Sequence, residues 1–453
     1  MVSTLVQTEK LTPSARRKLI LALAWPAVLE MMLHMMVGIV DTAMAGHLGP
    51  EALSAVGLGN QIYFSCVFIF ESVGIGASAI VARYIGARNR ERAGVIASQT
   101  FTLGIIIGGV LSLLGYIFSP SIMGVFHLTP EVRNLSIDYL RTLSYGWGFM
   151  LLLFINTAML RGAGNTRLPM ILAAFANILN IFFNYALIFG KFGMPALGVT
   201  GAAWGTVISQ SIGSIVLIFL LFKGSLNFKI TLNHMHYNFL TTTRILRVGL
   251  PTAVEESILS TGNLISSYFL THLGTEYFAA HQVANRVESL SYMPGFGFAL
   301  ASAALVGQSL GAKNPAEAEA NIWETVKLAV LSMSLMGVFF FLSAPHLVKI
   351  FSTDITVKSS GATCLRIAAL EQPFLSFVMV LLGALRGSGA TTSALMVSAL
   401  GIFGVRIPLF YLVIFKWQLG LTFVWWAMIV DWAVRSLIIF IIIRKGKWKS
   451  KKV

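Results

Sequence analysis

The chain carries two copies of one sequence, and the second copy is displaced from the first by 225 residues. Identical residues recur at this offset from Pro26 to Thr166, and no gap is needed to align them. The matched residues include Pro26 and Pro251, Glu30 and Glu255, Glu51 and Glu276, Asn60 and Asn285, Asn89 and Asn314, Arg161 and Arg386, and Gly164 and Gly389. Such a repeat predicts two halves with the same fold.

The composition of both copies is that of a membrane protein. Hydrophobic residues make up 56% of the chain and charged residues only 11%, whereas a soluble domain carries about 25% charged residues. Several stretches contain no charge, namely 93–118, 168–190, 192–222, 328–345 and 387–405. Each approaches or exceeds the roughly 20 residues that cross the hydrocarbon core as a helix. We therefore expect a polytopic, all-α membrane protein.

Twelve spanning helices are predicted, six in each copy. The expected ranges are 17–46, 53–85, 93–118, 135–160, 168–190, 196–222, 244–272, 276–310, 322–346, 360–387, 392–416 and 420–443. Because six is even, both copies enter the membrane from the same face, so the repeats are parallel and related by a pseudo-two-fold axis along the membrane normal. The predicted domains are a segment 1–16, an N-lobe 17–222, a linker 223–243, a C-lobe 244–443 and a basic tail 444–453.

The basic residues predict the orientation. Their excess gives a net charge of +15, and they gather in alternate connections, 22 Lys and Arg on one side against 6 on the other. Basic residues mark the cytoplasmic side. We expect a multi-pass protein of the inner or plasma membrane, with both termini and the linker cytoplasmic. The placement argues against nucleic acid as a partner.

Acidic residues within the expected helices are the first candidates for a functional site. A charged side chain at the bilayer centre costs at least about 2.5–3.5 kcal/mol. Asp431 and Arg435 are four residues apart and are expected to neutralise each other, but Asp41 has no cation within a turn. An unpaired buried carboxylate is protonated or holds a cation, and both states suit ion coupling. The alternative is a protonated acid that only bonds a neighbouring helix.

Polar and bendable positions accompany these acids. Asn180, Asn184 and Thr206 offer neutral oxygens that suit Na⁺ beside one carboxylate, although hydrogen bonds between helices explain them equally well. Pro26 and Pro251 interrupt the hydrogen-bond ladders of their helices and make hinges possible. The alternative for both prolines is a static kink.

Several motifs resemble the MATE (multidrug and toxic compound extrusion) transporters. They are Val40-Asp41-Thr42-Ala43-Met44-Ala45-Gly46-His47-Leu48-Gly49, Tyr84-Ile85-Gly86-Ala87-Arg88, the Leu-Arg-Gly-x-Gly runs at 160–164 and 385–389, and Gly249-Leu250-Pro251. The resemblance covers about residues 15–445. It implies two six-helix lobes around a central cleft and export of organic cations or drugs in exchange for Na⁺ or H⁺.

The resemblance also implies coupling residues. The family's N-lobe ion site maps onto Asp41, Asn180 and Thr206, and Asn184 stands where the family has an Asp. The C-lobe site maps onto Glu255 and Glu371, with Glu256 as an extra acid. We expect Glu255 and Glu371, with Asn285 near them, to form the stronger cation site, and Asp41 to accept a proton. Na⁺, if it is the coupling ion, would bind at Glu255, Glu371 and Asp41.

The cleft is expected to be apolar with a few acids, lined by Glu30, Glu256, Phe68 and Tyr292. The expected cargo is an amphipathic organic cation, the expected surroundings are membrane lipid, and the chain is expected to act as a monomer without a cofactor. A lipid-linked oligosaccharide flippase of the same superfamily is the alternative, but its cavity would need Arg and Lys for pyrophosphate. A membrane-embedded enzyme is less favoured, because the sequence lacks His-Glu-x-x-His, Gly-x-Ser-x-Gly and Cys-x-x-Cys motifs.

Overall fold

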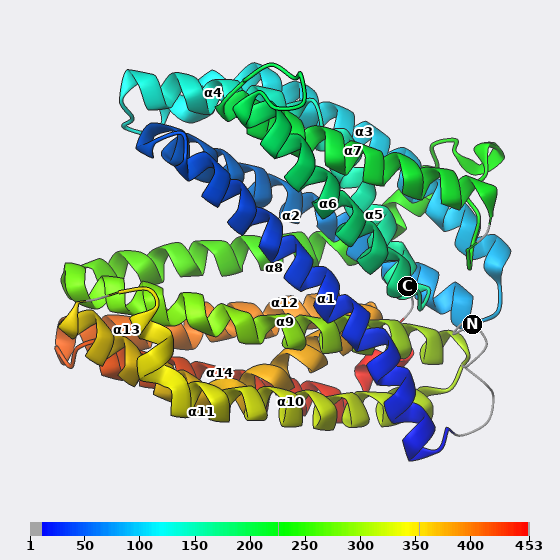
Figure 1. Ribbon diagram of the computed structural model, residues 1–453. Helices are drawn as coiled ribbons and strands as arrows, with labels where there is room; N and C mark the ends of the chain where they lie inside the picture. Colours follow the sequence, from blue (N-terminus) through cyan, green and yellow to red (C-terminus); the bar gives the residue numbers. More distant parts are fainter. Residues whose placement is uncertain (1–10, 225, 353, 452–453) are drawn as a thin grey trace. The chain divides into compact units, whose positions relative to one another are not determined.

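The computed structural model describes residues 11–224, 226–352 and 354–451, and this part of the chain is helical without a strand (Figure 1). Residues 1–10 and 452–453, at the ends of the expected N-terminal segment and tail, lie outside it. The helices are α1 (Pro13–Gly46), α2 (Pro50–Gly86), α3 (Arg90–Gly124), α4 (Pro130–Ser144), α5 (Trp147–Gly162), α6 (Arg167–Phe189), α7 (Val199–Lys223), η1 (Leu232–His234), α8 (Phe239–Thr271), α9 (Thr275–Gly311), α10 (Pro315–Lys349), α11 (Ile355–Gly387), α12 (Thr391–Ala399), η2 (Leu400–Arg406), α13 (Ile407–Tyr411), η3 (Leu412–Lys416), α14 (Leu421–Lys445) and η4 (Lys447–Ser450).

Each of the twelve expected helices has a counterpart, so the all-α membrane fold is confirmed. Ten helices of the described chain are long and apolar enough to cross a membrane, and α4 with α5 makes an eleventh if this pair, bent by 54°, is one span. Helix α8 is long enough but carries four charged residues, Arg244, Arg247, Glu255 and Glu256. The helix after Thr391 continues to Lys416 through the two π-helical segments η2 and η3.

The internal repeat is reproduced in the backbone of the turns. The side chain of Asn89 accepts a hydrogen bond from the backbone N–H of Arg92 and so caps α3 (2.9 Å). Asn314 caps α10 in the same way through the N–H of Glu317 (3.0 Å). Such caps satisfy donors that the first turn of a helix leaves unpaired. The matching positions of the two copies therefore end and begin helices by the same local chemistry.

The described chain divides into two compact units, and the boundaries fall inside α1 and α8. Unit 1 contains residues from Leu29 to Ala253, and unit 2 contains α1 as far as Val28 together with residues from Val254 onward. The two boundaries differ by the repeat offset of 225 residues. Each lies two residues after a proline, Pro26 in α1 and Pro251 in α8. Both helices thus begin in one unit and end in the other.

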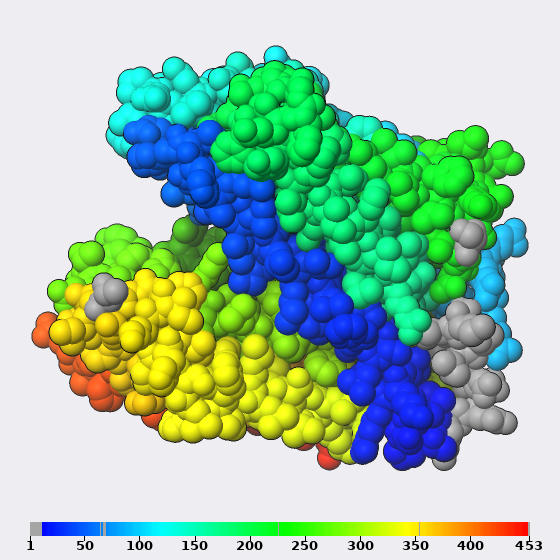
Figure 2. Space-filling view, in the orientation of Figure 1, coloured from blue at the N-terminus to red at the C-terminus, as the bar shows by residue number. Residues whose placement is uncertain are grey.

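Close backbone contacts hold the first half of each of these helices. In unit 1, a Cβ on Gly76 of α2 would lie only 2.6 Å from the carbonyl oxygen of Ile245 in α8. In unit 2, a Cβ on Gly297 of α9 would lie 2.9 Å from the carbonyl oxygen of Ala24 in α1. Only glycine permits such an approach at these two positions. Figure 2 shows the dark blue start of α1 on the yellow helices of unit 2.

Ion pairs add to this attachment in unit 2. Arg16 binds both carboxylate oxygens of Glu317 in α10 at 2.9 and 3.0 Å, and its Nε also donates to Asn321. Bidentate arginine–carboxylate pairs are among the stronger ones. The start of α1 is therefore fastened to α10 by a geometry that a single surface contact does not provide.

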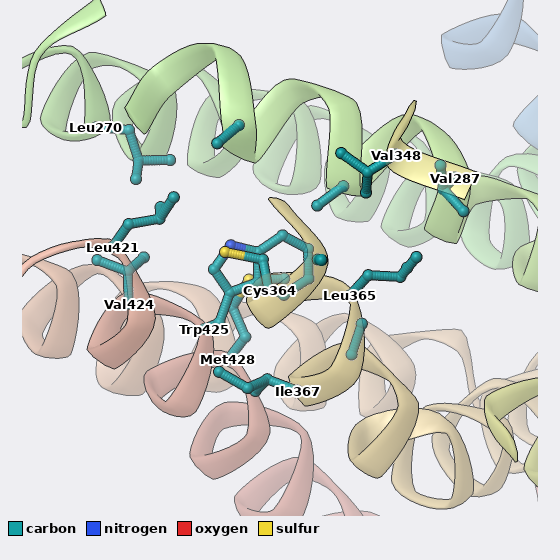
Figure 3. Close-up of a cluster of buried hydrophobic side chains, with 14 of the residues drawn as sticks. Leu270, Val287, Val348, Cys364, Leu365, Ile367, Leu421, Val424, Trp425 and Met428 are labelled. Carbon is teal, nitrogen blue, oxygen red and sulfur yellow. The ribbon is translucent and has the colours of Figure 1, made fainter. Parts of the chain in front are cut away.

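The hydrophobic core of unit 2 lies where α9, α11 and α14 meet. Val287, Cys364, Leu365, Val424 and Trp425 are buried there (Figure 3). Cys364 is a free thiol, as is Cys66 in unit 1. This core positions the polar residues of α9, α11 and α14 described below.

Candidate functional site

Asp41 is the centre of a buried polar cluster in unit 1. It lies on α1 with 3% of its surface exposed. The amide of Asn184 on α6 donates to Asp41 Oδ1 at 2.5 Å and to Asn180 Oδ1 at 3.2 Å. The amide of Asn180 donates in turn to Thr206 Oγ1 on α7 at 3.2 Å. Four residues named by the sequence as ion-coupling candidates thus form one chain of hydrogen bonds.

The local sequence explains this arrangement. Asn180 and Asn184 are four residues apart, so they share one face of α6. Gly205 lets α7 approach, because a Cβ there would collide with the side chain of Asn184. The Oδ1 atom of Asn184 is buried and has no hydrogen-bond partner in the described chain. One carboxylate, an unpartnered amide oxygen and a hydroxyl are oxygen ligands of the kind that hard cations bind, so the residues fit Na⁺ as well as a proton.

A second cluster of unit 1 is built around Arg161, at the end of α5. Its Nη1 lies 2.7 Å from Glu30 Oε1 on α1, and its Nη2 lies 3.5 Å from Glu71 Oε1 on α2. His34, one turn after Glu30, is 4.0 Å from the same Glu30 oxygen. Glu30, which the sequence placed in the substrate cleft, is therefore a buried member of an ion pair.

Unit 2 contains the repeat counterpart of this pair. Arg386 Nη2 lies 3.1 Å from Glu255 Oε1 and 3.7 Å from Glu256 Oε1, both on α8. The hydroxyl of Ser398 on α12 also donates to Glu255 Oε1 at 2.7 Å. Glu255 is fully buried. The repeated Glu and Arg of the sequence thus meet within their own unit in both halves.

Glu371 lies in a different part of unit 2. It is fully buried on α11 beside Glu288 of α9, and both face Tyr292 and Arg406. Neither carboxylate oxygen of Glu371 has a hydrogen-bond partner in the described chain. The partners of Glu255 and of Glu371 are thus different residues. A buried carboxylate beside a second one is stabilised by a proton or a cation, which keeps Glu371 a coupling candidate.

Asp431 joins two arginines near this place. The i, i+4 pair with Arg435 is present, with Nε–Oδ1 at 2.6 Å and Nη2–Oδ2 at 2.7 Å. Arg406 of η2 adds a bond from its Nε to Oδ2 at 2.7 Å. Sequence reasoning did not find Arg406 as a partner, because it comes from another helix. The available signal was a lone arginine in a charge-free stretch, at a place where the helix is π-helical. Such segments are frequent at functional sites.

The remaining candidates are placed as follows. The amide of Asn285 bonds Nε2 of His281 at 2.7 Å on the same helix. Tyr292 is half-buried beside Glu288 and Glu371. The side chain of Phe68 lies outside the described residues. Across the described chain, no group of three or more His, Cys, Asp or Glu side chains is arranged to hold a metal ion.

Comparison with known proteins agrees with this architecture. The sequence model of the MatE family matches residues 26–186 and 251–412, one match in each copy of the repeat. A probable multidrug resistance protein NorM of Thermotoga maritima is 35% identical over 442 residues, which are 97% of this chain and 95% of that protein. The multidrug resistance protein PmpM of Pseudomonas aeruginosa is 28% identical over 90% of this chain and 85% of its own.

The fold is also that of a solved transporter. A crystal structure of MATE in complex with MaL6 superimposes with a TM-score of 0.89 at 24% identity, covering 96% of this chain and 98% of that one. At this identity the likeness concerns the fold, while the family match rests on sequence in both halves. The chain belongs to the MatE family of membrane transporters and is not an enzyme.

Proposed function

We propose that this protein is a secondary active multidrug exporter, which moves amphipathic, mostly cationic compounds out of the cell in exchange for Na⁺ or H⁺. Relatives named as multidrug resistance proteins support the drug cargo. The observation that carries the ion exchange is the presence of buried acids, Asp41 and Glu371, that no cationic side chain pairs with directly. Each needs a proton or a cation while it is buried.

The buried arginines favour this proposal over a flippase for lipid-linked oligosaccharides. A pyrophosphate cargo requires free guanidinium or ammonium groups. Arg161, Arg386, Arg406 and Arg435 each pair with a carboxylate of their own unit instead. The excess charge of the two glutamate clusters is negative, which suits a cationic cargo.

The proposed cycle uses the two straddling helices. Pro26 and Pro251 each lie two residues before a unit boundary, at a place where proline weakens the helical hydrogen-bond ladder. Binding of a cation at Asp41 or Glu371 would change the charge of a helix bundle on one side of such a hinge. Alternating access would follow as the two lobes change their relation, with both termini and the linker 223–243 on the cytoplasmic side and the chain acting as a monomer.

Reconstituted proteoliposomes test the proposal. Efflux of a cationic fluorescent drug is measured under an imposed Na⁺ gradient and then under a pH gradient. We expect Asp41→Asn and Glu371→Gln each to lower the rate at least about tenfold while the protein stays folded, because each change keeps the shape and removes the charge. Glu51→Gln, on the exposed start of α2, is the matched control.

Two outcomes would contradict the proposal. Wild-type efflux in both Asp41→Asn and Glu371→Gln would remove these acids from ion coupling. Transport of a lipid-linked sugar, without drug efflux under either gradient, would favour the flippase.

A further inference from the structure

The cluster around Arg161 holds more negative than positive charge. Two carboxyl groups, Glu30 and Glu71, share the single guanidinium of Arg161. Glu30 has 1% of its surface exposed and Arg161 has 5%, so water screens neither group well. The Oε2 atom of Glu30 is also buried without a hydrogen-bond partner in the described chain. With both carboxyl groups ionised, a whole charge would stand uncompensated in a low-dielectric place, which is costly.

The groups that face the cluster do not supply the missing positive charge. His34 on α1 lies at the 4.0 Å limit from Glu30 and is not a direct hydrogen-bond partner of it. Tyr63 on α2 faces Glu71 as a neutral phenol. From α6, the amide of Asn177 donates to the carbonyl oxygen of Leu33 rather than to either acid. One positive charge is therefore wanting.

A proton fits the vacancy better than a metal ion. The guanidinium of Arg161 lies against both carboxyl groups, where a metal ion bridging them would have to sit. A proton needs no additional room. It also gives one of the carboxyl groups an O–H donor, which the unpartnered Oε2 atom of Glu30 can use directly or by turning toward Glu71.

The internal repeat supports this reading independently. Arg386 also faces two carboxyl groups, Glu255 and Glu256. The first acid is at the repeated position in both units, but the second is not. Glu71 corresponds to Phe296 in the second copy, and Glu256 corresponds to Met31 in the first. Each half thus reaches a ratio of two acids to one arginine from a different place in the sequence, as expected if the excess charge has a use.

We infer that Glu30, Arg161 and Glu71 form a proton-binding site in unit 1, separate from the cluster of Asp41. The site binds one proton between its two carboxyl groups and releases it to solvent through Glu71, whose side chain is 17% exposed. In the protonated form the cluster is neutral, and after release it carries one negative charge. This goes beyond the proposed function, because it adds an ion site that the exchange of drug for cation does not require.

Infrared difference spectroscopy of the purified, full-length protein tests the inference without transport. The carbonyl stretch of protonated carboxylic acids is recorded while the pH is raised from acidic to alkaline. We expect the loss of one acid in either Glu71→Gln or Glu30→Gln to remove one titrating carboxyl band, since one carboxylate and one guanidinium remain and need no proton. Glu51→Gln should keep the wild-type spectrum, and Glu71→Asp should restore the band.

Asp41→Asn separates this site from the other cluster of unit 1. Its effect on the spectrum should add to that of Glu71→Gln, because the two clusters share no residue. An unchanged band in both Glu30→Gln and Glu71→Gln would overturn the inference, since it would mean that both acids stay ionised. Failure of drug efflux under a pH gradient would contradict proton coupling in the proposed function, but it would leave this band as it is.

Discussion

Replacing Asp431 by asparagine should destabilise unit 2 strongly. The carboxylate of Asp431 is fully buried and accepts three charge-assisted hydrogen bonds, from Nε of Arg406 and from Nε and Nη2 of Arg435. Asparagine keeps one oxygen acceptor, and it places an N–H₂ donor where Oδ2 now accepts two of the bonds. Two buried guanidinium groups would then face each other across a neutral side chain.

The expected loss follows from these contacts. Removing one partner of a buried ion pair costs about 3–5 kcal/mol, because the remaining charge is left uncompensated. The rings and stems around the site do not replace the lost carboxylate, although Arg435 and Arg406 lie 4.9 and 5.6 Å from the ring centre of Trp432. For a unit of this size, such a loss lowers the melting temperature by on the order of 10 °C.

Cys364 provides the assay. Its thiol is 1% exposed in the core of unit 2 and lies beside Trp425 (Figure 3). In a Cys66→Ser background, a thiol-reactive fluorescent dye reports only the opening of this core during heating. Asp354→Asn is the matched control, because Asp354 caps α11 at an exposed position and asparagine caps equally well.

The two variants must differ for the reasoning to hold. If Asp431→Asn melts at the same temperature as Asp354→Asn, the carboxylate does not neutralise the two arginines. The assignment of the buried charges of unit 2 would then have to be revised.

The other predictions concern the Asp41 cluster and the repeated caps. Gly205→Ala should lower drug efflux sharply in proteoliposomes while the melting temperature changes less, because the new Cβ pushes the Asn184 side chain away from Asp41; unchanged efflux would detach Asn184 from the ion site. Asn314→Ala should cost about 1 kcal/mol through the lost cap of α10, as should Asn89→Ala for α3, measured by thermal unfolding against the exposed control Glu51→Gln. Equal stability of both alanine variants and the control would show that the repeated caps do not hold the helix ends.

The sequence predicted most of the fold because the repeat and the apolar stretches are properties of the chain itself. It placed some helix ends too far inside. The expected helices 135–160 and 322–346 begin in the structure at Pro130 and Pro315, each at the first turn of its helix. Hydropathy marks only the apolar part of a helix, whereas a proline at the first turn marks its start. The bend between α4 and α5 also lay beyond it, since Gly146 packs on Val207 of α7 there.

Contacts between helices were predicted only where the spacing within one helix determined them. The pair Asp431–Arg435 follows from a separation of four residues. The partners of Glu30 and Glu71 do not, because Arg161 reaches them from α5. The repeat does show that a Glu and an Arg recur at one offset, but it gives no distance between them. Only tertiary packing shows that the recurring residues bind each other.

The two halves fill equivalent positions with different chemistry. Thr206, which accepts a hydrogen bond from Asn180 in unit 1, corresponds to Asp431 in unit 2, and Gln210 corresponds to Arg435. Tyr63 corresponds to Glu288, the neighbour of Glu371. Unit 1 thus surrounds a single acid, Asp41, with neutral oxygens, whereas the matching places in unit 2 hold a network of charges.

This difference constrains the coupling of the transporter. Neutral oxygens around one carboxylate leave the choice between a proton and a small cation to the solvent composition, since either removes the single charge. In unit 2, Arg406 and Arg435 already face the acids, so a further cation has to act against two fixed positive charges. The two halves are therefore expected to respond differently to Na⁺ and to pH, rather than to give the doubled response of two equal sites.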